Sequence, residues 1–240
     1  MRLMLILFSV AVLGLSGFAG WFFFGGPEDD PTRVKLAATL SQIEALKPKA
    51  QSGDIRAQYE LARLYHLGKF GSRNLPEAYK WYSKAAEKGH TGAQYAIGTF
   101  FAEGKVVRQS YYRASEWYLL ASNLGRSPDA QFALGELYFN GRGVPHGYAE
   151  ARDWYTKAAE QGHPVAQFRL GAMIAEGWTG GFDAVEAYKW FTLAVRGQDR
   201  VAAHDPKLDV RAVLGRLARD MNENQIQRAE AAARAWRPKR

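Results

Sequence analysis

The strongest constraint on the fold is an internal repeat of about 36 residues that occupies most of the chain. Four kinds of marker recur in one register, with successive spacings of 36, 37 and 36 residues. Repetition at such a period is the pattern of solenoids, in which each unit packs on its neighbours. The markers are Ala-Gln pairs beginning at Ala57, Ala93, Ala130 and Ala166; tryptophans Trp81, Trp117, Trp154 and Trp190, each followed by another aromatic residue; glycines Gly68, Gly104, Gly141 and Gly177; and alanines Ala78, Ala114, Ala151 and Ala187.

Each unit has the pattern of two amphipathic helices, as the third unit shows. Its first helix is AQFALGELYFNG (residues 130–141), and its second is YAEARDWYTKAAEQ (residues 148–161). Gly141 and Gly162 fit the left-handed residue that ends a helix, while Gly135 and Ala151 would let neighbouring helices approach closely. One helix pair cannot bury both of its apolar stripes, so the units must stack. We therefore predict an all-α solenoid of four helix-turn-helix repeats, at residues 57–92, 93–129, 130–165 and 166–201.

The first 25 residues fit a transmembrane anchor. Leu3–Phe24 contains no charged residue, and a helix of this length would span about 33 Å, against a hydrocarbon core of about 30 Å. Arg2 precedes the run and three acidic residues follow it. This pattern predicts a single-pass membrane protein with its N-terminus cytoplasmic and its repeats on the extracytoplasmic side, which in a Gram-negative bacterium is the periplasm. A cleaved signal peptide ending at Gly17-Phe18-Ala19 is the alternative, but its apolar region would be unusually long.

Within the predicted anchor, Gly14, Gly17 and Gly20 form a stripe of small residues that would let a second transmembrane helix approach. Residues 26–34 are expected to link the anchor to the repeats. Residues 35–52 have the pattern of a second helix without its first. Gly53, which follows them, stands 36 residues before Gly89, the glycine after the second helix of the first repeat. This segment is therefore predicted to cap the solenoid, which would extend over residues 35–204.

Two further helices are predicted to cap the C-terminal end, in residues 205–240. Asp205-Pro206 is a favourable start for a helix that would run to about Arg219. Asn222 with Gln225 three residues later resembles a capping box, which predicts a last helix ending near Trp236.

These repeats resemble the Sel-one-like repeat family, a relative of the tetratricopeptide repeats. The family pattern is roughly AQ-x-x-LG-x-x-Y-x-x-G-x-GV and then KA-x-x-WY-x-KAAEQG, and residues 130–165 match it nearly throughout. The second unit departs by one inserted residue within SNLGRSPD (residues 122–129), and the fourth by Ile174 at the tyrosine position and by its GWTGG loop. The resemblance covers about 145 residues. It implies an α-solenoid and a role as adaptor or scaffold. The C-terminal tail M-x-x-x-Q…A…A-x-x-W (residues 221–236) is similar to the tail of some bacterial members, which supports a bacterial origin.

The sequence provides no set of residues for catalysis, a cofactor or a metal. Cysteine is absent, which excludes thiolate chemistry and cysteine-ligated metals, and none of the motifs HExxH, GxSxG or GK[ST] occurs. His90 and His163 share one repeat position, which indicates that they shape a loop. A metal site that combines His66 with Glu60 or Glu103 is possible in principle, but the spacing does not require one. We expect no enzyme activity, no cofactor and no metal.

The net charge of +8 leaves two interpretations open. The basic residues are spread over expected helix surfaces, which favours a solvated face over a dedicated site. An anionic partner is the alternative, and no nucleic-acid-binding motif accompanies the charge.

The resemblance to tetratricopeptide solenoids places the first helix of each repeat on the concave surface. The third, seventh and tenth residues of these helices would then line an aromatic-rich groove that binds a partner. Alternatively, the third-position rings are partly buried between adjacent helices. The recurring Trp-aromatic pairs are expected to pack at the seams between repeats rather than to form a stacking platform. The groove positions are Tyr59, Arg63 and His66; Tyr95, Thr99 and Ala102; Phe132, Glu136 and Phe139; and Phe168, Ala172 and Ala175.

Together these patterns favour a non-enzymatic protein–protein scaffold, an accessory or assembly subunit of a bacterial inner-membrane complex that holds a partner segment in its groove. The alternative is a glycan- or peptidoglycan-binding envelope module that uses the aromatic face and the basic charge. A cell-wall enzyme is a third hypothesis, for which no acid, base and nucleophile can be assembled.

Overall fold

The computed structural model describes residues 31–68, 73–125, 127–178 and 180–239. Within these ranges, no helix is both long and apolar enough to cross a membrane. The predicted anchor (residues 1–25), with its Gly14, Gly17 and Gly20 stripe, lies outside the described residues. Part of the predicted linker is described, and there it differs from the prediction, because a helix already begins at Pro31.

Twelve helices, and no strand, form the described part of the chain. We call α2, α4, α6 and α8 the A helices of repeats 1 to 4, and α3, α5, α7 and α9 their B helices. The helices are α1 (Pro31–Gln51), α2 (Ile55–Leu67), α3 (Leu75–Glu87), α4 (Thr91–Glu103), α5 (Tyr111–Gly125), α6 (Pro128–Asn140), α7 (Tyr148–Glu160), α8 (Pro164–Ala175), α9 (Ala184–Val195), α10 (Gln198–His204), α11 (Val210–Arg219) and α12 (Glu223–Ala235).

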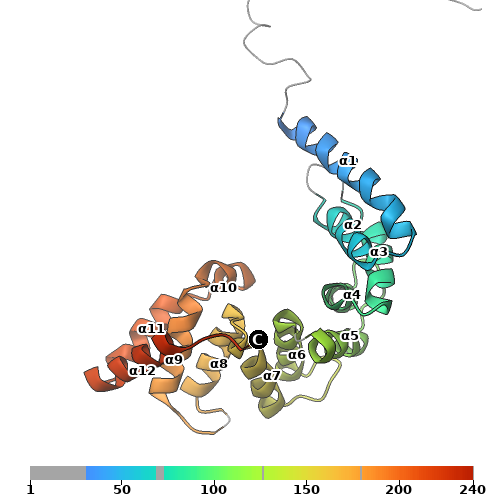
Figure 1. Ribbon diagram of the computed structural model, residues 1–240. Helices are drawn as coiled ribbons and strands as arrows, with labels where there is room; N and C mark the ends of the chain where they lie inside the picture. The colour runs from blue at the N-terminus through green and yellow to red at the C-terminus, as the bar shows by residue number, and fades with distance from the viewer. Residues whose placement is uncertain (1–30, 69–72, 126, 179, 240) are drawn as a thin grey trace, which may run out of the picture.

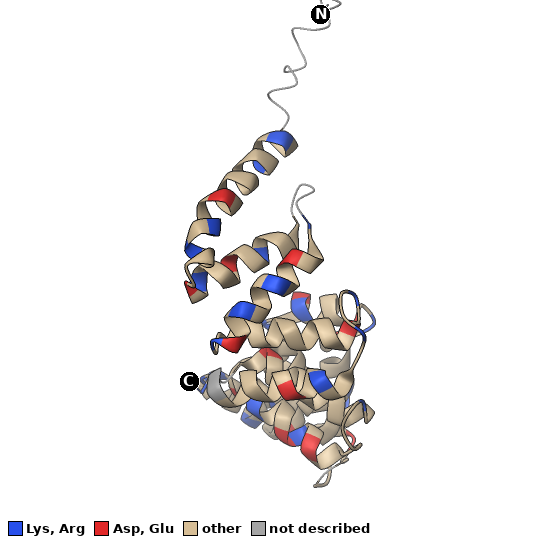
Figure 2. Cartoon of the chain, turned by 90° about the vertical axis from the view of Figure 1, so that its right-hand side faces the viewer, with Lys and Arg blue, Asp and Glu red and all other residues tan. Residues whose placement is uncertain are grey.

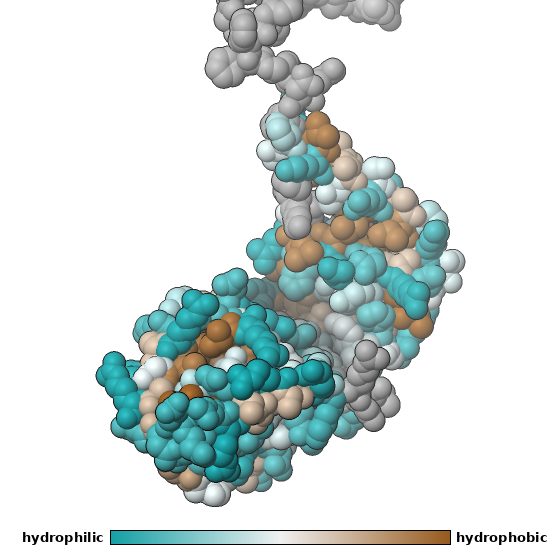
Figure 3. Space-filling model, turned by 60° about the vertical axis from the view of Figure 1, so that its left-hand side comes forward, coloured by the Kyte–Doolittle hydropathy of each residue, from teal (hydrophilic) through white to brown (hydrophobic). Residues whose placement is uncertain are grey.

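The helices form a curved solenoid in which each B helix packs on its own A helix and on the next A helix along the chain. In Figure 1 the arc runs from α1 through α5 to α9, with the A helices on its inner side and the B helices outside. Figure 3 shows the surface hollowed between the N-terminal and C-terminal parts of this arc. The structure therefore has the predicted all-α solenoid architecture, with A helices on the concave side.

The same local chemistry begins each A helix. The N-cap residue accepts a hydrogen bond from the backbone N–H three residues later, which satisfies one of the donors left free at a helix start. His90 and His163 do this through Nδ1, at 3.2 and 3.1 Å, so their predicted role in shaping a loop is confirmed. Asp54 and Ser127 occupy the same position in the other two repeats.

The glutamine of each Ala-Gln marker is buried and joins consecutive repeats. The side-chain amides of Gln58, Gln94 and Gln167 donate to carbonyl oxygens at the end of the preceding helix, at 3.0, 3.3 and 3.2 Å. In the third repeat this bond is replaced, because α5 is longer than the other B helices and carries the predicted insertion. There Gln131 Oε1 accepts from the amide of Gln161 at 2.6 Å.

Small residues bring the two helices of a repeat into close contact, as predicted for Gly135. A Cβ atom built on Gly135 would lie 2.5 Å from the ring of Tyr155 in the B helix. Gly98 has the same relation to Tyr118, also at 2.5 Å. Glycine is needed here because the aromatic ring occupies the space that any side chain would fill.

The N-terminal helix α1 ends the solenoid with a polar face. Its Ile43 and Ala50 are buried against repeat 1. Ala78 and Ala85 of α3, which lie on the face packed against its A helix, correspond one period earlier to the exposed Gln42 and Lys49. Polar side chains at these two positions let α1 stand without an A helix of its own, as a cap must.

The C-terminal end differs from the prediction in one respect. Asp205-Pro206 does not start a helix but forms a turn after α10, with the Asp205 carboxylate accepting from the N–H of Lys207 at 2.9 Å. α10 lies against α8, where the A helix of a fifth repeat would begin, and the turn at Pro206 ends it after seven residues. α11 starts instead at Val210, where Asp209 accepts from two backbone N–H groups at 3.0 Å.

The last helix agrees with the sequence. The predicted capping box of Asn222 and Gln225 is present at the start of α12, with both bonds at 2.9 Å. Beyond α12, Trp236 packs on Trp190, and Lys239 pairs with Glu160 of repeat 3 at 2.6 Å. α12 and the tail thus cover the open side of α9 and fasten the end of the solenoid.

Candidate protein-binding surfaces

The third-position aromatics of the A helices belong to the packing between helices rather than to a free groove. Each ring packs on the aromatic residue of its own B helix, with centroid distances of 5.5–5.9 Å. Phe168 is only 5% exposed, so its predicted place on an accessible face is wrong. Tyr59, Tyr95 and Phe132 are half-buried. The interpretation that these rings are partly buried is therefore the one that the structure supports.

Two of these rings are also covered by the next repeat. Tyr59 stacks on His90 at 4.0 Å between ring centroids, and Phe132 stacks on His163 at 4.6 Å. Both histidines keep Nδ1 as a hydrogen-bond acceptor, and burial lowers the pKa of each below its usual value. Sequence reasoning placed these histidines in a loop but missed the ring that each covers.

Charged side chains surround His163 where α10 meets the start of α6. His163 Nε2 lies 3.4 Å from Asp129 Oδ1, and Arg200 of α10 forms an ion pair with the same carboxylate. His204 packs edge-on against Phe132 at 5.2 Å. These contacts hold α10 across α8 to the start of α6, so this charged cluster closes the end of the concave face.

Of the seventh and tenth positions of the A helices, Arg63 is exposed and the others are half-buried. Glu136 accepts a hydrogen bond from Tyr155 Oη at 2.5 Å and forms an ion pair with Arg169 at 3.0 Å, so its carboxylate is bonded within the protein. Arg63 pairs with Glu60 of its own helix at 3.2 Å. His66 contacts the ring of Phe100 in the next A helix at 5.4 Å. Among the described residues, no group of three or more potential metal ligands occurs.

The Trp-aromatic pairs pack as seam residues, but the two members of a pair are buried to different degrees. Tyr155 is 0% exposed, whereas Trp154 is half-buried and carries Lys157 Nζ 3.9 Å from its ring centroid. Trp81 and Trp190 are both buried. The second aromatic therefore fills the core in repeat 3, and the tryptophan forms its outer edge.

One group of stacked aromatic residues remains open to solvent, at the loops that join A to B helices. The aromatic cluster consists of Phe139 at the end of α6, Tyr148 at the start of α7 and Trp178 after α8. Phe139 and Trp178 stack at 5.4 Å with an interplanar angle of 16°, and Tyr148 lies 5.0 Å from Trp178. Tyr148 is 41% exposed, Trp178 45%, and the nearby Phe182 62%.

Sequence reasoning found only Phe139 of this cluster. The signal for Trp178 is the GWTGG loop, which departs from the repeat pattern, whereas Tyr148 carries no such signal. A tryptophan at a position that the repeat leaves free is not required by the fold.

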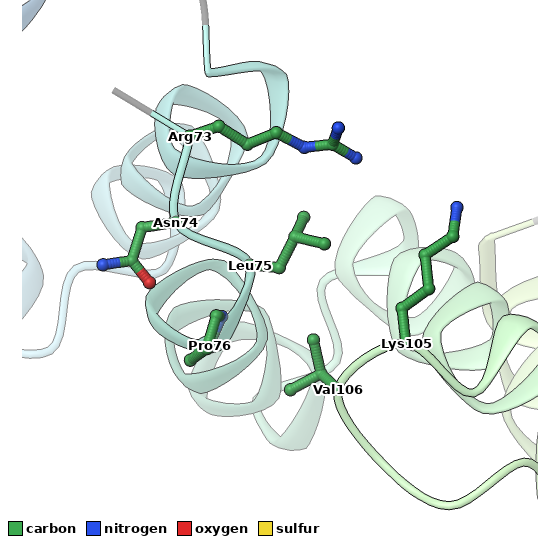
Figure 4. Close-up of a pocket in the computed structure, with 6 residues that line it drawn as sticks. All are labelled: Arg73, Asn74, Leu75, Pro76, Lys105 and Val106. Carbon is green, nitrogen blue, oxygen red and sulfur yellow. The ribbon is translucent and has the colours of Figure 1, made fainter. Parts of the chain in front are cut away.

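A recess lies at the corresponding place between repeats 1 and 2. Its outer part has a volume of about 780 Å³ and is lined by Arg73, Asn74, Leu75, Pro76, Lys105 and Val106. In Figure 4 the side chains of Arg73 and Lys105 extend toward the same side, with Leu75 between them. A smaller hollow of about 160 Å³ shares Arg73, Leu75 and Lys105 and reaches His66 on the concave face.

Elsewhere the surface charge is mixed. Figure 2 shows Lys and Arg side by side with Asp and Glu along the helices in view. Several basic residues pair with an acid three or four residues away on the same helix, such as Lys80 with Glu77 and Lys189 with Glu186. These pairs agree with the interpretation of the basic charge as a solvated surface.

Comparison with known proteins gives the same repeats. The family model described as Sel1 repeat matches residues 55–90, 91–125, 128–163 and 164–199. A protective antigen of uropathogenic Escherichia coli strains, which displays an SLR fold, is 31% identical with a TM-score of 0.68; the match covers 81% of this chain and 40% of that structure. A Sel1 repeat protein from Oxalobacter formigenes is 28% identical with a TM-score of 0.66, covering 81% of this chain and 76% of the other.

This chain therefore spans less than half the length of the Escherichia coli antigen. A search of curated proteins found no match. The four family matches fall on the four structural repeats and cover more than half of the chain. The chain belongs to the Sel1 repeat family.

Proposed function

We propose that this protein is a non-enzymatic scaffold that binds a protein partner along the edge formed by its A–B loops, with the aromatic cluster as the main anchor. Sel1 repeats generally mediate protein–protein interaction. The observation that carries this assignment is the exposure of Tyr148 and Trp178, which stack with Phe139 where the fold does not require them. A few aromatic anchors commonly dominate the binding free energy of an interface.

The proposed cellular location rests on the sequence before residue 31. The uncharged run Leu3–Phe24 supports a single-pass anchor with a cytoplasmic N-terminus and periplasmic repeats. An accessory or assembly subunit of a bacterial inner-membrane complex is the role that fits such an anchor and a protein-binding solenoid. The mature protein should fractionate with membranes and retain Met1 or Arg2. Recovery of a soluble form that begins near Gly20 would contradict the anchor.

Affinity purification tests the role of the aromatic cluster. The full chain, extracted in a mild non-ionic detergent, is compared with a variant carrying Tyr148→Ser and Trp178→Ser, and bound proteins are identified by mass spectrometry. Tyr112→Ser is the matched control, because Tyr112 is 62% exposed on α5 and lies outside the cluster. We expect the double variant to lose the partner and the control to keep it. Equal recovery by both variants would refute the assignment.

A glycan ligand is the second candidate, since sugar rings also stack on exposed tryptophan and tyrosine side chains. Treatment with peptidoglycan-degrading enzymes before purification separates the two candidates. A bound protein that survives this treatment supports the scaffold. Loss of all bound material, with direct binding of glycan fragments that depends on Trp178, supports the envelope module instead.

A further inference from the structure

The edge formed by the A–B loops contains one equivalent position at each junction between repeats. Four places in the repeat meet there: two from the loop and B-helix start of one repeat, and two from the loop of the next. At the first junction these are Arg73, Leu75, Lys105 and Val106; at the second Gln109, Tyr111, Arg142 and Gly143; at the third His146, Tyr148 and Trp178 are the described members.

The second and third junctions are filled by their own aromatic side chains. Arg142 lies 5.6 Å from the ring centroid of Tyr111, and Trp178 lies 5.0 Å from that of Tyr148. At the first junction the same position holds Leu75, whose shorter side chain leaves the recess between Arg73 and Lys105 open (Figure 4). The first junction therefore has an open space at the position that the protein's own aromatic side chains fill at the other two.

Hydrogen bonds of Asn74 hold the start of α3 beside the recess. Gly68 ends α2 in the left-handed conformation, with a φ of 55°. The N–H of Asn74 donates to the carbonyl of Tyr65 at 2.9 Å, and the Asn74 side chain caps α3. A preformed site loses less conformational entropy when a ligand binds.

We propose that this recess binds an acidic side chain of an extended segment in a partner protein, with its carboxylate between Arg73 and Lys105 and an adjacent apolar side chain on Leu75 and Val106. This inference rests on the proposed protein-binding function and specifies part of its ligand. Arg73 has no acidic partner among the described residues. The ion pair that Lys105 forms within them is with the exposed carboxylate of Glu103, at 3.0 Å. Arginine and lysine bind carboxylates through charge-assisted hydrogen bonds.

The composition of the recess favours a protein segment over a polyanion. Among the described residues that line it, two are cations, Glu103 stands beside one of them, and Leu75 and Val106 make the surface between them apolar. A nucleic acid or a sulfated or uronic polysaccharide would call for a row of cations along its backbone. One carboxylate beside an aliphatic side chain matches two cations beside a leucine and a valine.

His66 provides a built-in reporter of this binding. Its pKa is lowered by burial and then by the positive charge of Arg73, with Lys105 acting in the same direction and Glu103 opposing it. A carboxylate held between the two cations would offset their charge. Binding should therefore raise the pKa of His66, and a ligand that binds elsewhere should leave it unchanged.

The test uses the full chain in non-ionic detergent and a fluorescein-labelled 12-residue peptide of alternating glutamate and leucine. The control peptide has glutamine in place of glutamate. Fluorescence anisotropy gives the affinity for each peptide, and an NMR titration follows the His66 ring. We expect at least tenfold weaker binding of the glutamine peptide, and an upward shift of the His66 pKa only with the acidic one.

Two variants locate the site. The double variant Arg73→Gln with Lys105→Gln should weaken binding of the acidic peptide at least tenfold. Leu75→Tyr should do the same with both cations in place, because tyrosine at this position occupies the other two junctions. Arg108→Gln is the matched control: it removes one exposed charge from the loop of Lys105 but does not line the recess.

Equal weakening by Arg108→Gln, full binding by Leu75→Tyr, or equal affinity for both peptides would each overturn the proposal. So would tighter binding of an oligogalacturonate through the same two cations, which would make the ligand a glycan. These outcomes can be told apart from failure of the proposed function. Loss of the partner after Tyr148→Ser and Trp178→Ser, with no effect of the recess variants, would leave the scaffold standing and remove only this ligand.

Discussion

Individual aromatic residues differ in what they contribute, even at neighbouring positions. Tyr155 is completely buried, and its hydroxyl donates to Glu136 at 2.5 Å, whereas Trp154 is partly exposed and carries Lys157 over its ring. The sequence pattern gave both residues the same apolar stripe. Periodicity identifies the face of a helix that is buried, but the depth of each residue depends on its neighbours in the adjacent helices.

This difference predicts unequal costs of truncation. Tyr155→Ala should reduce the free energy of unfolding by about 3–5 kcal/mol, because it empties a filled core position. Trp154→Ala should cost less, about 2–3 kcal/mol, because part of its ring is already in water in the folded protein. Chemical denaturation of both variants measures the two values. A larger loss for Trp154→Ala than for Tyr155→Ala would contradict the packing described above.

The N-cap histidines predict a pH dependence of stability. His163 accepts a backbone hydrogen bond at Nδ1 and is buried, with Asp129, Arg200 and His204 facing it, and burial is the main reason that its pKa is lowered. The unfolded chain, with a histidine pKa of about 6.5, binds the proton more readily than the folded chain. The contribution of His163 to the free energy of unfolding should therefore be fully present above about pH 6.5 and be lost as the pH falls below it. The same sign applies to His90 and His66.

His163→Ser provides the control, because Ser127 caps the equivalent helix without titrating in this range. The variant should keep its N-cap and show a smaller loss of stability between pH 7 and pH 5 than the original protein. Thermal melting across this range measures the difference. A slope unchanged by the substitution would show that His163 does not contribute to the pH dependence.

At the scale of the helices, glycine has opposite effects at two positions. Gly135 lies against Tyr155, which cannot move aside because Glu136 holds its hydroxyl, so Gly135→Ala should cost about 1–3 kcal/mol. Gly215, inside α11, has no atom near the place of a Cβ, so Gly215→Ala should stabilise by about 0.5–1 kcal/mol through helix propensity. Melting temperatures that shift in the same direction for both variants would contradict this account.

The sequence predicted the helices well wherever the repeat applied and less well beyond it. The repeated markers placed the A and B helices, and the capping box of Asn222 and Gln225 is confirmed. The helix predicted from Asp205-Pro206 was wrong, because Asp209 four residues later supplies an equally good cap and puts Val210 in the core. Local capping signals cannot choose between two candidates that differ only in their tertiary contacts.

At the scale of the whole molecule, the proposed binding surface lies at the edge of the concave face, whereas the sequence predicted it along the A helices. The A helices do line the inner side of the arc, but their third-position rings are occupied by contacts with B helices and with the next N-cap. Of the predicted groove residues, His66 and Thr99 line the hollow beside the recess, and Phe139 belongs to the aromatic cluster. Side chains of the following loops complete both sites, and a pattern based on A helices alone could not identify them.

Hydrogen–deuterium exchange of the full chain, with and without its purified partner, tests the central claim most directly. Binding along the A–B loop edge predicts slower exchange in residues 139–149 and 176–184, which contain the aromatic cluster, and no change in residues 152–160 of α7 and 187–195 of α9. Slower exchange confined to the outer B helices or to α11 and α12, with both loops unchanged, would contradict it.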